Sequence, residues 1–182
     1  LHVADANFDT LSVGPIERGF STQFGKWSGD PLEVITESDG NQRLRFIETG
    51  NVKGNPSGGA SASNAFQFID LTALQRQSQN SDAAGQKTLE LSVYFERDAA
   101  SAIDEEFPRI KSGCAIYLFE TDPQSVIQGW PNVLNDAVAI GRKKVRIKPG
   151  KHSEKITTTC VLEPEATIAL ITLDVGIGRG SQ

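Results

Sequence analysis

The strongest constraint on the fold is an alternation of apolar and polar residues with a period of two. In the segment 88–97, the apolar side chains Leu89, Leu91, Val93 and Phe95 occupy every second position. Successive side chains of a β-strand point to opposite faces of the sheet, so these four residues share one face. The pattern is typical of a strand that buries one face and exposes the other.

Segments of this kind recur along the chain and are separated by residues that favour turns. The sequence Ser38-Asp39-Gly40-Asn41, for example, has the composition of a tight hairpin turn. We expect strands at 31–36, 42–49, 65–71, 88–97, 114–121, 143–148, 155–162 and 167–174. A short helix is expected at 72–77. These strands predict an all-β fold, a two-sheet antiparallel jelly-roll sandwich that forms a single domain over residues 1–182.

Charge and hydropathy argue against two classes of partner. Lys and Arg number 18 against 23 Asp and Glu, and the net charge of −5 argues against general nucleic-acid binding. No apolar run approaches the roughly 20 residues that a membrane-spanning helix needs, so we expect no membrane insertion. The chain also has no methionine, even at position 1. We therefore expect it to be an excised domain or a mature fragment of a longer protein.

Four short motifs follow one another along most of the chain. They are Asn7-Phe8-Asp9, Trp27, Leu91-Ser92-Val93-Tyr94-Phe95 and Pro164-Glu165-Ala166-Thr167. Their order resembles that of the galactose-binding-like jelly rolls found in many carbohydrate-binding modules. The resemblance implies a non-catalytic glycan-binding module attached to an extracytoplasmic protein, whether periplasmic, cell-surface or secreted. It also implies a structural calcium ion.

The resemblance points to two aspartates as calcium ligands. Asp9 is the better placed, although it could equally be a strand-edge carboxylate that accepts bonds from backbone N–H groups. Calcium needs six to eight oxygen ligands, so backbone carbonyls would have to complete the shell. The family usually ends on a strand whose acidic residue helps to hold the ion. Either Asp174 has that role, or 167–174 is the penultimate strand and the final strand is missing from this sequence.

Trp130 is the aromatic residue that best fits a sugar-binding role. It lies in Gln128-Gly129-Trp130-Pro131-Asn132, which has the composition of a loop. An exposed tryptophan in a loop could stack on a sugar ring, and loops often carry binding residues. The alternative is that the ring tucks under the loop in a small apolar cluster.

The segment 141–155 carries seven basic residues and one acidic residue, Glu154. Among the basic residues, Arg142, Lys144 and Arg146 are the candidate ligand-binding side chains. Together with Trp130 they could bind an anionic glycan, because Arg and Lys side chains recognise sulfate and carboxylate groups. The alternative is that these cations keep an exposed strand from pairing with another molecule.

Catalytic chemistry has little support in the sequence. Histidine occurs only as His2 and His152, so neither a histidine-based triad nor a zinc site with several imidazoles is expected. Cys114 and Cys160 are expected either as buried thiols or as a disulfide. The sequence therefore favours a carbohydrate-binding accessory module without catalytic residues. A structural spacer or protein-interaction domain is the alternative, and a small glycoside hydrolase or lyase is a third interpretation.

Overall fold

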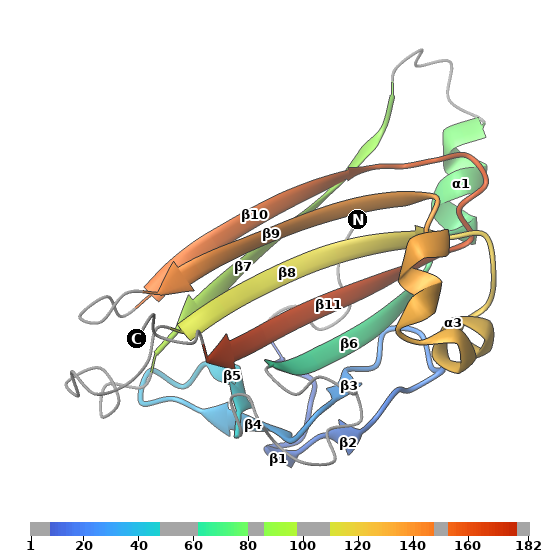
Figure 1. The fold of residues 1–182 in the computed structure, drawn as a ribbon. Helices are drawn as coiled ribbons and strands as arrows, with labels where there is room; N and C mark the ends of the chain where they lie inside the picture. The colour runs from blue at the N-terminus through green and yellow to red at the C-terminus, as the bar shows by residue number, and fades with distance from the viewer. Residues whose placement is uncertain (1–7, 48–61, 80–85, 98–109, 148–152, 178–182) are drawn as a thin grey trace.

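A computed structural model describes residues 8–47, 62–79, 86–97, 110–147 and 153–177 of the chain (Figure 1). Within these ranges β-strands dominate, as expected for an all-β fold. The strands are β1 (Gly14–Pro15), β2 (Glu17–Arg18), β3 (Ser28–Gly29), β4 (Leu32–Thr36), β5 (Gln42–Phe46), β6 (Ala62–Asp70), β7 (Thr88–Glu96), β8 (Ile110–Phe119), β9 (Ala139–Ile147), β10 (Ser153–Val161) and β11 (Ile168–Ile177). The helices are α1 (Thr72–Gln79), which confirms the expected short helix, α3 (Pro123–Gly129) and the 3-10 helix η1 (Asn132–Asp136).

The described strands form three hydrogen-bonded sheets. The largest has the order β2-β3-β6-β11-β8-β9, and the smaller ones are β1-β4-β5 and β10-β7. Figure 1 shows the long strands β6, β11, β8 and β9 side by side, with β10 running along β9. The expectation of two wholly antiparallel sheets is thus corrected, because β2 pairs in parallel with β3. Both strands are two residues long, in an N-terminal segment whose Gly and Pro residues interrupt longer ladders.

One face of the six-stranded sheet packs against both smaller sheets. Its residues Leu118 and Ile171 belong to the same buried cluster as Leu32 of β4, Leu91 of β7 and Ile156 of β10. This cluster is the main core, and the face that contributes to it is called the inner face below. Fully burying side chains of this size stabilises the fold by roughly 1.5–3 kcal/mol each. The arrangement is sandwich-like, with the two smaller sheets forming the second layer.

The opposite, outer face of the six-stranded sheet carries a second apolar cluster. Phe66 and Phe68 of β6, Tyr117 of β8 and Leu170 of β11 pack there against residues of α3 and η1. Strands β6, β8 and β11 therefore bury side chains on both faces. In β8, every residue from position 112 to position 119 is buried, so its apolar residues are nearly continuous rather than alternating.

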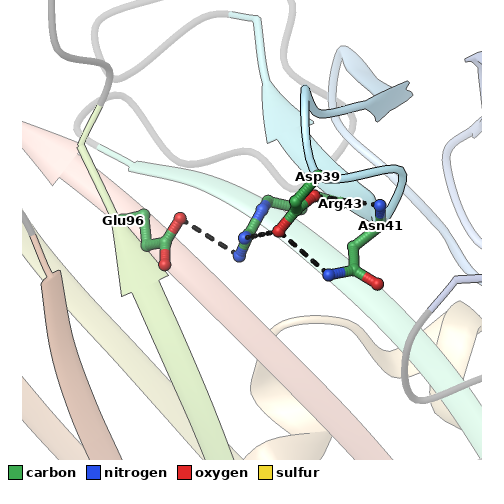
Figure 2. Close-up of polar contacts among 4 residues, drawn as sticks. All are labelled: Asp39, Asn41, Arg43 and Glu96. Carbon is green, nitrogen blue, oxygen red and sulfur yellow. Dashed lines mark hydrogen bonds and ion pairs between the residues drawn. The ribbon is translucent and has the colours of Figure 1, made fainter.

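An ion-pair network joins the two smaller sheets across the second layer (Figure 2). Arg43 of β5 bonds Glu96 of β7 through Nη1 at 3.1 Å and Asp39 through Nη2 at 3.4 Å. Asp39 also accepts hydrogen bonds from the backbone N–H and the side-chain amide of Asn41, each at 2.9 Å. These bonds, with a smaller contribution from Arg43, lower the pKa of the Asp39 carboxyl. Arg43 thereby ties the β4–β5 hairpin to the end of β7.

Candidate functional site

The three basic residues that the sequence assigns to ligand binding share one face of β9. Arg142, Lys144 and Arg146 are all exposed, whereas Gly141 before them and Ile147 after them are buried, and Val145 between Lys144 and Arg146 is partly buried. Ile147 belongs to the main core, so the alternation along β9 directs the three cations to the outer face. This placement follows from the period of two in the sequence.

A fourth cation of the outer face was missed by the sequence analysis. Lys111 of β8 lies directly opposite Arg146 of β9 in the antiparallel register, which places their Cα atoms about 5 Å apart. Like charges that face each other across two strands are destabilising. Within the described part of the chain, neither Lys111 nor Arg146 forms an ion pair. The positive charge at this position is therefore uncompensated by the described residues.

Asp174 of β11 is ion-paired with Lys144 across the intervening strand. Its Oδ2 lies 3.1 Å from the Lys144 Nζ. In register, Asp174 faces Gly113 of β8, and Gly113 faces Lys144. A Cβ at Gly113 would overlap Asp174 Oδ1 and lie 3.0 Å from Lys144 Cγ, so the missing side chain lets the pair meet above β8. The Asp174 side chain is 13% exposed and that of Lys144 is 60% exposed.

Trp130 caps the end of α3 and packs into the outer apolar cluster. Its ring centroid lies 5.1 Å from that of Phe20 and 5.3 Å from that of Phe66, in edge-on geometry. The side chain is only partly buried. This position corresponds to the alternative in which the ring packs into a small cluster. Residues 128–132, which the sequence indicated as a loop, contain the end of α3 and the start of η1.

Trp130 and the cations nevertheless lie over the same face of the same sheet. Phe66, which contacts the Trp130 ring, is in register with Thr172 of β11, Ala115 of β8 and Arg142 of β9. The strands β6 and β9 are three steps apart, or about 14 Å. The outer face thus has an apolar half, covered by α3 and η1, and a cationic half on β8 and β9, which begins at Arg142 in the row of Phe66 and continues to Lys111 and Arg146 toward the other end of the strands.

The two aspartates expected to bind calcium come from separate elements. Asp9 is exposed in a turn next to Phe8, whose ring lies 5.6 Å from that of the buried Trp27. Asp174 is held by Lys144 on the outer face. Among the described residues, no three His, Cys, Asp or Glu side chains are grouped so that they could hold a metal ion. Calcium binding remains a prediction, and the surroundings of Asp174 favour an ion pair over a metal ligand.

Both cysteines are buried and free, which confirms the thiol interpretation over the disulfide. Burial, with a smaller contribution from the nearby Asp174 carboxylate, raises the pKa of the Cys114 thiol to about 11. Burial is also the main cause of the raised pKa of Cys160. Neither thiol has the lowered pKa of a catalytic nucleophile.

Some residues singled out in the sequence lie outside the described residues. They are Asn7, His2 and His152, together with Lys148 and Lys151 of the basic segment 141–155. Within the part that is described, no helix is long and apolar enough to cross a membrane.

Comparison with known proteins does not assign the chain to a family. No protein-family model matches it, and a search of curated proteins gives no significant match.

Proposed function

We propose that this chain is a non-catalytic accessory module of an extracytoplasmic protein and binds an anionic polysaccharide on the cationic half of its outer face. The observation that carries the proposal is the Lys111–Arg146 pair, directly opposed in register and without an acidic partner among the described residues. Arg142 and Lys144 extend the same surface along β9. The galactose-binding-like jelly roll suggested by the four sequence motifs is part of this proposal.

An anionic ligand would relieve the repulsion between Lys111 and Arg146. A sulfate or carboxylate placed between the two side chains would add two opposite-charge contacts that offset the one like-charge contact. Arginine can also bind such a group through two parallel N–H donors. Because the whole chain carries a net charge of −5, attraction of a polyanion has to come from this local concentration of cations.

Among the described residues of β8, β9 and β11, the outer face lacks the pair of carboxyl groups that hydrolysis of a glycan requires. Glycosidases generally use two carboxyl groups about 5–10 Å apart. On the described outer face of β8, β9 and β11, Asp174 is the one acidic residue, and Lys144 binds it. This arrangement favours binding over glycoside hydrolase chemistry at this surface.

Titration with polysaccharides of different charge tests the proposal. We expect the protein to bind a heavily sulfated polysaccharide such as heparin at low salt, and to bind the neutral polymer dextran far more weakly. Binding should weaken steeply as salt increases, because exposed charges are screened beyond about 8 Å at physiological ionic strength. The double variant Lys111→Ala/Arg146→Ala should lose about tenfold or more in affinity, equivalent to about 1.4 kcal/mol.

A matched control removes two cations elsewhere on the molecule. Lys26 forms an ion pair with Glu17 near the N-terminal end, and Lys155 lies over the ring of Tyr94 on the exposed face of the β10–β7 sheet. The variant Lys26→Ala/Lys155→Ala has the same net charge as Lys111→Ala/Arg146→Ala but should retain affinity. Equal losses in the two variants, or no binding by the wild type, would contradict the proposal and favour a spacer or protein-interaction domain.

A further inference from the structure

Asp174 is an acidic residue next to the cationic half of the outer face, which is called the cationic surface below, and the pattern of the sequence does not explain its presence there. On the described outer face of β8, β9 and β11 it is the one carboxylate, and it lies beside the four cations, which β8 and β9 carry. Its partner Lys144 sits between Arg142 and Arg146 on β9. The ion pair crosses β8 at Gly113, where a side chain would collide with Asp174. The charge of the central cation is therefore compensated within the protein.

We infer that Asp174 determines which anionic chains this surface selects, an inference that rests on the proposed polysaccharide binding. By neutralising Lys144, Asp174 divides the cationic surface into two points of attraction. One is Arg142, and the other is the opposed pair of Lys111 and Arg146. Because Arg142 and Arg146 are four residues apart on one strand, these points are about 13 Å apart.

Two separated points favour an extended ligand with several anionic groups. A small ligand with one anionic group engages one point only. A chain long enough to place anionic groups at both points gains from the second contact as an intramolecular event, without a second loss of translational freedom. The ligand class is therefore a polyanionic oligosaccharide that spans about 13 Å or more, rather than a single acidic sugar.

The pair also explains why Lys144 does not act as a third point of attraction. Asp174 is far more buried than Lys144, and a carboxylate in that position would be costly to leave without its cation. A ligand that captures Lys144 would have to separate it from Asp174. Lys144 therefore stays with Asp174, and its charge is not available to short ligands.

The test compares Asp174→Asn with Glu33→Gln, a variant of equal net charge. Glu33 of β4 is bonded to Arg45 of β5, so Glu33→Gln also removes a carboxylate from an ion pair between neighbouring strands. Each protein is titrated with a sulfated disaccharide and with a long sulfated oligosaccharide of the same repeat. We expect Asp174→Asn to raise affinity for the disaccharide about fivefold or more and to narrow the preference for the long chain. Glu33→Gln should change neither.

The single variant Lys144→Gln and the double variant Lys144→Gln/Asp174→Asn complete a double-mutant cycle. They keep the proposal testable if Asp174→Asn alone does not fold. Lys144→Gln alone should weaken binding of both ligands, because it leaves the Asp174 charge uncompensated. The double variant should show the wild-type preference for the long oligosaccharide over the disaccharide, because it removes an ion pair that has no net charge.

The role of Asp174 would be overturned if Asp174→Asn kept the wild-type preference for the long oligosaccharide over the disaccharide. It would also be overturned if Glu33→Gln gained as much affinity for the disaccharide. Either result would leave polysaccharide binding itself intact. Failure of the wild type to bind either sulfated ligand would instead overturn the proposed function itself.

Discussion

Two glycines on neighbouring strands allow contacts that a larger residue would prevent. Gly113 lets Asp174 and Lys144 meet above β8 on the outer face. On the inner side, a Cβ at Gly141 would overlap the backbone carbonyl of Thr159, so this glycine permits the close approach of β9 to β10. In both cases the absence of a side chain is needed for contact, and the backbone angles of these two residues are ordinary.

The Cys114 thiol should be inert in the native protein. Its side chain is 1% exposed, and its pKa is raised to about 11 by burial and by Asp174. At pH 8 only about one thiol in a thousand would be ionised, and the thiolate is the reactive form. We expect no alkylation of Cys114 by iodoacetamide at pH 8 until denaturant is added, measured by mass spectrometry. Native labelling as fast as in the denatured chain would contradict this expectation.

The raised pKa of the Cys114 thiol makes the stability of the fold depend on pH in the alkaline range. Below pH 9 the thiol is protonated in both the folded and the unfolded chain. Between pH 9 and about pH 11 the unfolded chain loses this proton and the folded chain keeps it, so the stabilising contribution is lost as pH rises. The free energy of unfolding, measured with urea at a series of pH values, should therefore fall more steeply with pH in the wild type than in Cys114→Ala across this interval. Below the interval the two proteins should show the same dependence on pH.

Among the elements, α3 was missed although its start is encoded locally. Asp122 accepts hydrogen bonds from the Ser125 backbone N–H at 3.0 Å and from the Ser125 hydroxyl at 2.8 Å, and Pro123 occupies the first turn. The helix has seven residues, too few to display a helical period. Reading 128–132 as a loop followed from this omission, and with it the expectation that Trp130 could be an exposed platform.

The cap at Asp122 should control how firmly Trp130 is packed. Asp122→Ala removes the cap, whereas Asp122→Asn keeps a side-chain acceptor. In a Trp27→Phe background Trp130 is the remaining tryptophan, so its fluorescence reports on α3 directly. We expect acrylamide quenching of Trp130 to increase in Asp122→Ala and to stay unchanged in Asp122→Asn. Equal quenching in all three proteins would show that the cap does not hold the ring.

The positions of the strands along the chain were predicted far better than the pairing between strands. Strands at 88–97 and 143–148 were predicted, and the structure extends the second of them to Ala139–Ile147, where alternation places Arg142 on the same face as Lys144 and Arg146. The start of β8 was missed because residues 110–113, Ile-Lys-Ser-Gly, have neither the apolar content nor the alternation of the rest of the sheet. Lys111 was missed with it. Its position opposite Arg146 depends on a pairing between distant segments, and no local pattern specifies such a register.

In the whole molecule, the six-stranded sheet separates two apolar clusters. The inner cluster joins this sheet to both smaller sheets, and the outer cluster joins it to α3 and η1. The second layer is held together by the inner cluster and by the contact of Arg43 with Glu96 (Figure 2). Because β6, β8 and β11 contribute side chains to both clusters, neither cluster can lose its structure without disturbing strands of the other.

The two tryptophans allow this coupling to be measured. Trp27 is 3% exposed in the inner cluster, and Trp130 packs against the outer one. In Trp130→Phe the fluorescence reports on the inner cluster, and in Trp27→Phe it reports on the outer cluster. Since both clusters share the central strands, each variant should give one urea midpoint by fluorescence and by far-UV circular dichroism, as expected for a cooperative domain.

The comparison is made within each variant, because removing part of a buried ring changes stability. Trp27→Phe should lower the midpoint through the lost apolar contact, with a cost of about 1–3 kcal/mol. Trp130→Phe should cost less because that ring is only partly buried. If Trp130 fluorescence in Trp27→Phe changed at a clearly lower urea concentration than the circular dichroism, α3 and η1 would unfold before the sandwich. The outer cluster would then be an independent cover rather than part of one cooperative unit.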